Sequence, residues 1–282
     1  MLDDFIDRIR TAHARATPLV IRGGGSKAFY GNPCTGDVLD THGWSGVVDY
    51  QPQQLVLTAR AGTPLGDLET LLAQHGQMLA FEPPHFGGCP LPSVDANAES
   101  SPVQATLGGC VAAGLSGPRR PYAGAVRDFV LGVRMIDGTG QALRFGGQVI
   151  KNVAGYDVSR LMAGSLGTLG LITEVSLKVL PKPAAETTLQ FESSEADAIL
   201  RMNQWAGQPL PLSATSWHAG LLTVRLSGAA SAVRAAQTRL GGETLAHADE
   251  FWLRLRDHRA AFFDTRPASS QLRLWRLAVK SS

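Results

Sequence analysis

The hydrophobic and polar positions of the chain follow two periods, and the switches between them separate predicted helices from strands. Apolar residues at 5, 6 and 9 recur at helical spacing and predict a helix over the first fifteen residues. Leucines at 65, 68, 71 and 72 predict a second helix, which begins after Thr63-Pro64 and ends at Gly76. Short apolar or alternating runs predict strands at 18–21, 38–40, 47–50, 55–61, 129–136, 141–145 and 171–180. The fold class predicted from this mixture is α+β.

The pattern changes after Pro181-Lys182-Pro183, which is the best candidate for a linker. Beyond it, the predicted elements are a strand at 187–191, a helix at 195–205, strands at 214–218 and 221–226, a helix at 230–240 and a strand at 243–246. This β-α-β-β-α-β order is that of a ferredoxin-like unit. A helix at 250–263 and a strand at 272–279 complete the prediction, and the chain stops just after that strand. We therefore expect two domains, 1–182 and 183–282, the second incomplete at its C-terminus.

Composition excludes several classes of protein. The 282 residues are 44% hydrophobic, and the net charge of +2 gives no reason to expect nucleic acid as a partner. No apolar run approaches the roughly 18–20 residues of a transmembrane segment, and the N-terminus lacks the apolar core of a signal peptide. Cys34, Cys89 and Cys110 are too few and too widely spaced for a disulfide framework or an iron–sulfur cluster. We expect a reduced, cytoplasmic protein without a metal site.

Three glycine-rich turns stand where predicted elements meet. The first contains Arg22, Gly23, Gly24, Gly25, Ser26 and Lys27, the second Thr106, Leu107, Gly108 and Gly109, and the third runs from 164 to 170. Glycine permits a positive φ and a close approach of backbone to a ligand, and consecutive N–H groups in such turns bind anions. No G-x-G-x-x-G and no P-loop sequence occurs in the chain. The turns are either tight structural connections or, taken together, the binding site of a ligand that carries a pyrophosphate.

On these turns, and on Lys151–Val158 before the third one, residues 21–181 resemble the FAD-binding domain of the vanillyl-alcohol oxidase and p-cresol methylhydroxylase family. Within that family the chain is similar to the FAD-binding subunits of the glycolate oxidase group. The resemblance implies a domain of two subdomains that holds FAD, followed by a cap domain. The implied cofactor-binding residues are Arg22, Gly23, Gly24, Gly25, Ser26, Lys27, Thr106, Leu107, Gly108 and Gly109 for the pyrophosphate, and Gly167, Gly170, Leu171 and Ile172 for the adenosine and flavin.

Some residues depart from the family's pattern. Leu166 stands where many relatives carry Glu, and neither of the first two turns contains a histidine that could link the flavin, so we expect noncovalent FAD. The histidine-rich H-x-G-D-G-N stretch of hydroxyacid-oxidising relatives is absent, and His218 in Trp217-His218-Ala219-Gly220, which is more simply a packed strand residue, is its nearest counterpart.

Candidates for acid–base chemistry and for substrate binding are few. His85 is a possible base in the long loop predicted at 82–104, and Arg119, Arg120 and Tyr122 could clamp a carboxylate or else form a solvated or partner-facing loop. Asp157 and Arg160 are interpreted as residues that support the third turn. No residue of the sequence is identified as catalytic.

The resemblance implies a subunit of a complex that oxidises glycolate to glyoxylate. Its expected partners are a larger homologous flavin subunit, an iron–sulfur subunit and a small hydroxyacid substrate. The expected location is cytoplasmic, with attachment to the inner membrane through those partners as the alternative. Because the cap lacks the histidine stretch, we expect this subunit to relay electrons or to support assembly. The alternatives are a stand-alone FAD-dependent 2-hydroxyacid dehydrogenase, a scaffold that has lost FAD, and the FAD subunit of a molybdenum hydroxylase, against which Lys151–Asp157 argues.

Overall fold

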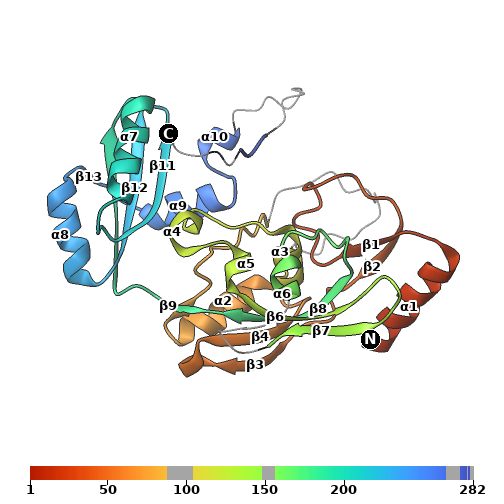
Figure 1. The fold of residues 1–282 in the computed structure, drawn as a ribbon. Helices are drawn as coiled ribbons and strands as arrows, with labels where there is room; N and C mark the ends of the chain where they lie inside the picture. The colour runs from red at the N-terminus through yellow and green to blue at the C-terminus, as the bar shows by residue number, and fades with distance from the viewer. Residues whose placement is uncertain (88–103, 148–155, 265–273, 278, 280–282) are drawn as a thin grey trace. The chain divides into compact units, whose positions relative to one another are not determined.

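The computed structural model describes residues 1–87, 104–147, 156–264, 274–277 and 279 (Figure 1). Outside these ranges lie Cys89, the first five residues of the Lys151–Val158 stretch, most of the loop predicted at 82–104, and residues 272, 273 and 278 of the strand predicted at 272–279. Residues 274–277 and 279, which the structure describes, are not in a strand, so the predicted strand is wrong at these positions. The chain divides into two compact units. The first unit combines Met1–Ser116 with Gly124–Lys182, and the second combines Gly117–Ala123 with Pro183–Ser282.

A five-stranded antiparallel sheet forms the base of the first unit. Its strands, in spatial order, are β3 (Val47–Gln51), β4 (Val56–Arg60), β8 (Leu171–Lys178), β6 (Val130–Ile136) and β7 (Ala142–Gly146). The neighbouring strands β4 and β8 are buried on both faces. Between them, the hydroxyl oxygens of Thr58 and Ser176 lie 2.8 Å apart and form a hydrogen bond. This pairing satisfies two polar groups that burial would otherwise leave without a hydrogen bond.

A smaller layer, visible at the right of Figure 1, packs beside this sheet. It consists of α1 (Leu2–Arg15) and the parallel strands β1 (Leu19–Arg22) and β2 (Asp37–Asp40). Phe5 and Ile9 of α1 form a buried cluster with Leu39, Ile136 and Leu171. The predicted amphipathic pattern of the N-terminal helix is therefore explained, because its apolar stripe packs against β2 on one side and against the five-stranded sheet on the other.

Short elements connect the layers and position the glycine turns. They are η1 (Pro52–Gln54), α2 (Leu65–Gln74), β5 (Gln77–Met78), α3 (Leu107–Ala113), α5 (Val126–Phe129), α6 (Val158–Leu161) and β9 (Leu180–Pro181). Helix α3 was not predicted, because its seven residues are small and show no helical periodicity. The helix begins where the Thr106 hydroxyl accepts a hydrogen bond from the Gly109 amide, which is N-capping by a threonine.

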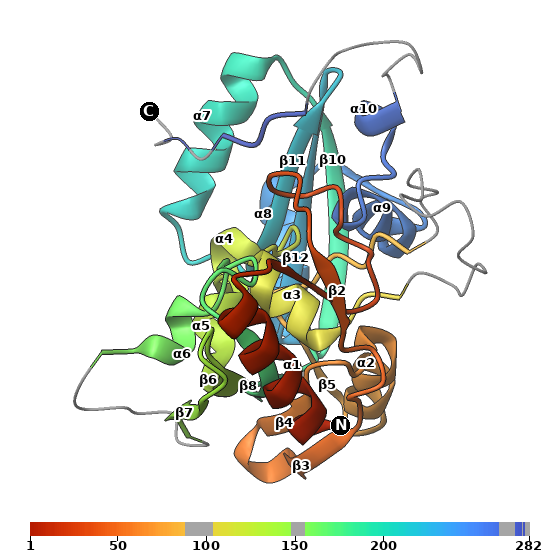
Figure 2. The same cartoon turned by 90° about the vertical axis from the view of Figure 1, so that its right-hand side faces the viewer.

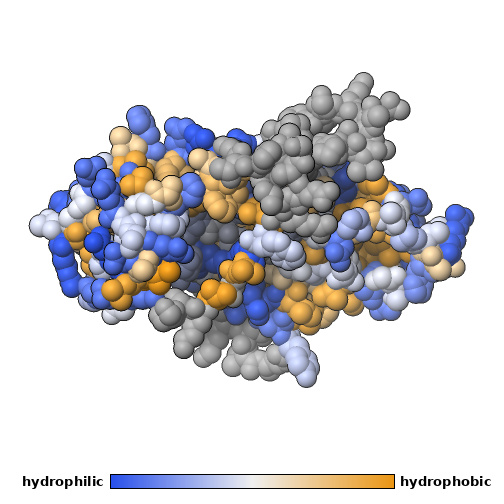
Figure 3. Space-filling view, turned by 90° about the horizontal axis from the view of Figure 1, so that it is seen from above, coloured by the Kyte–Doolittle hydropathy of each residue, from blue (hydrophilic) through white to orange (hydrophobic). Residues whose placement is uncertain are grey.

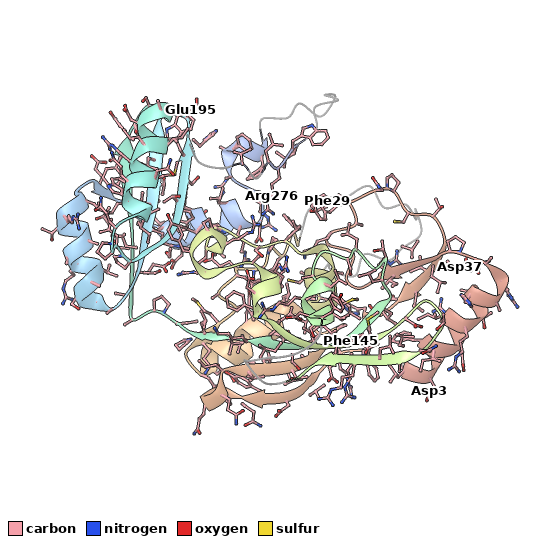
Figure 4. The ribbon with its side chains drawn as sticks, in the orientation of Figure 1. Asp3, Phe29, Asp37, Phe145, Glu195 and Arg276 are labelled. Carbon is pink, nitrogen blue, oxygen red and sulfur yellow. The ribbon has the colours of Figure 1, made fainter. Side chains whose placement is uncertain are left out.

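The second unit contains a four-stranded antiparallel sheet with the spatial order β11-β12-β10-β13. The first three of these strands are labelled in Figure 2 together with the helices of the unit. Its elements, in chain order, are α4 (Arg120–Ala123), β10 (Ala185–Glu192), α7 (Glu195–Ala206), β11 (Leu212–His218), β12 (Leu221–Gly228), α8 (Ala230–Leu240), β13 (Glu243–Thr244), α9 (Ala248–Arg256) and α10 (Ala261–Asp264). Its core consists of Leu189, Ala198, Leu222, Val224, Leu226, Val233 and Ala236. Glu195, labelled in Figure 4, begins α7, whose cap is Ser194.

The continuous helix predicted at 250–263 is wrong. Helix α9 ends at Arg256, and the short α10 follows after a break. At the break, His258 has a left-handed backbone with φ +54°, and its ring stacks on Phe263 at 4.4 Å between centroids. A left-handed residue ends an α-helix, and the periodicity of apolar residues contains no sign of it.

Candidate functional site

The first two glycine turns lie directly against each other. A β-carbon on Gly23 would overlap the hydroxyl oxygen of Thr106, and one on Gly24 would overlap the carbonyl oxygen of Gln104. Only residues without a side chain allow such an approach of two backbone segments. The turn at 22–27 and the segment 104–106 therefore form one wall, although some eighty residues separate them in the sequence.

The first turn places several backbone amides beside a lysine side chain. Within the described ranges, the backbone N–H groups of Gly23, Gly24, Gly25 and Ser26 donate no hydrogen bond. Gly25 has φ +73° and open space within 4 Å of where a β-carbon would stand. Lys27 adds a positive charge, and its Nζ donates to the Ser26 hydroxyl at 3.3 Å. Successive N–H groups beside an ammonium make a concave site for an anion.

The second turn has a different role from the one expected of its amides. The Leu107 amide donates to the carbonyl of Thr63 at 2.9 Å, and the Gly108 amide donates to the carbonyl of Ala61 at 2.7 Å. The Gly109 amide donates to the Thr106 hydroxyl. These hydrogen bonds anchor the start of α3 to the end of β4. The part of the second turn that lies against the first turn is the side chain of Thr106, next to Gly23.

The third turn joins the other two. The amides of Gly164 and Leu166 donate to the carbonyls of Val111 and Ala112 at the end of α3, at 3.0 and 2.9 Å. A β-carbon on Gly167 would stand 3.5 Å from Ile21, the residue just before the first turn. All three turns thus converge on α3 and β1. The Ser165 hydroxyl is buried there and has no hydrogen-bond partner among the described residues.

A pocket of about 500 Å³ opens beside the third turn. Gly167, Gly170 and Leu171 line it together with residues of α1 and β1. The first and second turns do not line it, and neither does Ile172, which pairs with Met135 in the sheet. Its size suits a small ligand or part of a larger one. The predicted residues of the first turn therefore form one place, the cradle of residues 23–27, and Gly167, Gly170 and Leu171 line a second, the pocket. Ile172 and the second turn belong to neither, although Thr106 packs against the first turn.

Titratable side chains lie close to the cradle. His85 Nε2 is 3.1 Å from Glu69 Oε2 on α2, which is an ion-pair distance without hydrogen-bond geometry. Burial raises the pKa of the Cys110 thiol on α3 to about 11, while the charge of Lys27 lowers it and that of Glu69 raises it. Lys27 and Glu69 therefore share one electrostatic environment at the start of α3. No sequence motif singles out Glu69 as a member of this cluster.

The other candidate residues near the third turn have supporting roles. Asp157 accepts a hydrogen bond from the Arg160 amide at 3.1 Å and caps α6, and its carboxylate also lies 3.2 Å from the Arg160 guanidinium. Leu166 has a left-handed backbone with φ +51° and is 48% exposed. In the exposed turn after β6, hydrogen bonds from Gln141 and Thr139 lower the pKa of Asp137.

Arg119 lies in the second unit, where it is buried rather than solvated. Its guanidinium contacts Glu186 Oε2 at 2.7 Å and the Ser227 hydroxyl at 3.1 Å, and Ser227 also bonds to Glu186. The predicted carboxylate clamp therefore holds a carboxylate of the chain itself. Arg120 is exposed, and the Tyr122 side chain is hydrogen-bonded to that of Thr215. His218 is the last residue of β11, as a strand residue should be, but the expectation that it is packed is wrong, because it is exposed and meets Phe262 only by a ring edge.

Apolar side chains also reach the surface. Figure 3 shows hydrophobic residues interspersed with hydrophilic ones on the face that it presents. The exposed large side chains near the first and third turns are Phe29, Tyr30, Leu161, Leu166 and Leu169. In the part of the chain that the structure describes, no helix is both long and apolar enough to cross a membrane. The same described residues contain no group of three or more His, Cys, Asp or Glu arranged to hold a metal.

Comparisons with known proteins place the chain in a family. A family described as "FAD binding domain" matches residues 2–90, which include the first turn. The chain is 47% identical over 277 residues to the glycolate oxidase subunit GlcE of Escherichia coli (strain K12), a match that covers 98% of this chain and 73% of that protein.

More distant relatives are longer proteins. The chain is 32% identical to the glycolate oxidase subunit GlcD of Bacillus subtilis (strain 168), with 69% of this chain and 39% of that protein covered. It is 31% identical to a D-lactate dehydrogenase of Archaeoglobus fulgidus, with 73% and 43% covered. The solved structure of an alkyldihydroxyacetonephosphate synthase superposes with a TM-score of 0.64 at 19% identity, over 93% of this chain and 54% of that one, which shows a shared α+β fold. By its similarity over nearly its whole length, the chain belongs to the family of the glycolate oxidase subunit GlcE, among the FAD-linked oxidoreductases.

Proposed function

We propose that this protein is the noncovalent FAD-binding subunit of a glycolate oxidase complex that oxidises glycolate to glyoxylate. The observation that carries the proposal is the cradle at the first turn, in a chain with 47% identity to a glycolate oxidase subunit. Four backbone amides without an acceptor among the described residues stand beside Lys27. A buried hydroxyl without a partner there, that of Ser165, lies in the adjoining third turn. These groups fit a dinucleotide, which brings a pyrophosphate and further hydrogen-bonding atoms.

Each turn has a separate task in this proposal. The amides of residues 23–26 and the ammonium of Lys27 hold the pyrophosphate, Thr106 supports that turn from behind, and Ser165 bonds a polar group of the cofactor. The pocket lined by Gly167, Gly170 and Leu171 receives the adenosine end, with Ile172 supporting it from the sheet. When bound, FAD supplies the redox chemistry, and the protein supplies binding and orientation.

The proposed division into two domains is supported by the two compact units, whose bounds differ from it in one segment. We assign 1–182 to an FAD-binding domain of the p-cresol methylhydroxylase type and 183–282 to a ferredoxin-like cap. The β-α-β-β-α-β order and the antiparallel sheet of the second unit support this assignment. The segment Gly117–Ala123 belongs to the second unit although it precedes β6 in the sequence, so the proposed boundary is crossed more than once.

The proposed partners are a larger homologous flavin subunit, an iron–sulfur subunit and a small hydroxyacid. The 32% identity to the subunit GlcD of B. subtilis supports a homologous pair. The chain lacks an H-x-G-D-G-N stretch, so we infer that the larger subunit oxidises glycolate while this one relays electrons or supports assembly. The place of action is the cytoplasm or the inner face of the membrane, through those partners.

The decisive experiment is an absorbance spectrum of the purified full chain before and after denaturation. Flavin bands that pass into the supernatant when the protein is precipitated indicate noncovalent FAD. A colourless protein that takes up no added FAD overturns the proposal in favour of a scaffold. Glycolate or D-lactate is then added anaerobically, with and without the partner subunits: bleaching of the flavin by the isolated chain indicates a stand-alone dehydrogenase instead of a relay.

A further inference from the structure

Phe86 links the first glycine turn to the helix that starts at the second. Its ring meets the ring of Phe29 edge-on, with centroids 5.2 Å apart, and the ammonium of Lys27 lies 5.6 Å from the Phe86 ring centroid. Phe29 is labelled in Figure 4 on the loop that follows the first turn. On its other side, Phe86 forms a buried cluster with Ala113 and Leu115, at and just beyond the end of α3.

The backbone of Phe86 is held in an unfavourable conformation. Its φ is +52°, the left-handed region that bulky residues rarely adopt, and the residue is only 6% exposed. Such a conformation persists where the surroundings hold it in place, and it is common at ligand sites. Two fixed features flank this backbone: the ring of Phe86 is buried, and Nε2 of the neighbouring His85 lies 3.1 Å from Glu69 Oε2.

A lysine binds an anion more tightly when its ammonium is held in place beforehand, and the ring of Phe86 is placed to hold that of Lys27. A lysine side chain has four flexible carbons, and ordering them on binding costs conformational entropy. An aromatic face within about 6 Å attracts the ammonium and restricts it before the ligand arrives. The hydrogen bond from Lys27 Nζ to Ser26 directs the same ammonium toward the amides of the first turn.

We propose that Phe86 is a positioning residue that pre-orders Lys27 at the phosphate cradle, with the His85–Glu69 pair holding Phe86 in its left-handed backbone. The inference rests on the proposed function, because the group that Lys27 awaits is the pyrophosphate of FAD. His85 and Phe86 act by positioning Lys27 and do not touch the reacting atoms.

The test is a double-mutant cycle on FAD affinity, measured by fluorescence titration of the apoprotein of the full chain. Phe86→Leu keeps an apolar side chain and removes the aromatic face, so we expect FAD affinity to fall about fivefold. Phe86→Tyr keeps the face and should stay within twofold of the wild type. In a Lys27→Met background, Phe86→Leu should change the affinity less than twofold. An equal loss in both backgrounds overturns the proposal.

A second measurement separates this inference from the proposed function. The rate of reductive methylation of Lys27, followed by mass spectrometry on the apoprotein without any FAD, should rise at least twofold in Phe86→Leu and stay unchanged in Phe86→Tyr. A wild type that binds no FAD refutes the proposed function. A Lys27 rate that is the same in wild type and Phe86→Leu refutes the positioning of Lys27, whether or not FAD binds.

Discussion

The carbonyl oxygen of Gln104 occupies the space that a β-carbon on Gly24 would fill. Two segments far apart in the sequence therefore meet backbone to backbone at the proposed phosphate cradle. Gly24 does not have a positive φ, so the need for glycine here comes from contact and not from backbone conformation. Its neighbour Gly25 is the reverse case, with φ +73° and nothing within 4 Å.

The substitution Gly24→Ala should abolish tight FAD binding. The new methyl group must push the 104–106 segment away from the first turn, so we expect affinity to fall more than tenfold and the unfolding midpoint to drop. Gly25→Asn is the matched control, because asparagine tolerates left-handed backbone and meets open space. FAD titration and thermal unfolding measure both effects. Similar losses for the two variants would show that backbone conformation, not contact, limits this turn.

The substitution Ser165→Ala should separate stability from cofactor binding. The hydroxyl of Ser165 is buried without a partner in the described structure, and a buried unsatisfied polar group costs about 1–3 kcal/mol. Its removal should leave the free energy of unfolding of the apoprotein unchanged or raise it by about 1 kcal/mol. FAD affinity should fall roughly tenfold, because a hydrogen bond to the cofactor is lost. An apoprotein that loses stability with unaltered FAD affinity would assign Ser165 a purely structural role.

How far the sequence predicts this fold can be seen by comparing α7 with α3. The helix predicted at 195–205 is confirmed, because α7 spans Glu195–Ala206, and the structure adds that the Ser194 hydroxyl caps it by accepting a hydrogen bond from the Asp197 amide. Helix α3 is made of small residues whose side chains give no period, and it exists because Thr106 caps it and because Leu107 and Gly108 donate to Thr63 and Ala61. Those hydrogen bonds join distant segments, so no local pattern contains them.

In the candidate site, too, some features are visible in the sequence and others depend on contacts between distant segments. The glycines of the first and third turns mark their positions in the sequence, since glycine is what a close approach requires. The sequence could not show that the amides of Leu107 and Gly108 are already bonded. Nor could it show that Arg119 is buried against Glu186, because charged residues in a Pro- and Gly-rich segment are usually solvated. Arg119 is buried because Glu186 and Ser227, which pair across the sheet of the second unit, both bond to its guanidinium.

The substitution Glu186→Leu should destabilise the second unit. Glu186 lies 2.7 Å from Arg119 and 3.8 Å from Arg225, and the side chains of these arginines are only 9% and 4% exposed. Removal of one partner from a buried ion pair leaves charge uncompensated, so we expect a loss of about 3 kcal/mol in the free energy of unfolding. Arg134→Gln is the control, because Arg134 is 55% exposed in its pair with Glu174 and should cost less than about 1 kcal/mol. Denaturant unfolding of both variants measures the difference, and equal losses would contradict this account of Arg119.

The buried thiol of Cys110 should make stability fall as the pH rises above 9. Its pKa is about 11 in the folded protein and 9.0 without the fold, and desolvation by burial is the main cause. Between these values the unfolded chain loses the thiol proton while the folded chain keeps it, so the folded state binds more protons and becomes less stable as pH increases. At about 1.4 kcal/mol per pKa unit, the loss approaches roughly 2–3 kcal/mol by pH 11. Urea unfolding from pH 8 to 11 should show a smaller decline in Cys110→Ala and an unchanged one in Cys34→Ala, whose thiol is exposed. Parallel pH profiles for all three proteins would mean that Cys110 does not carry the effect.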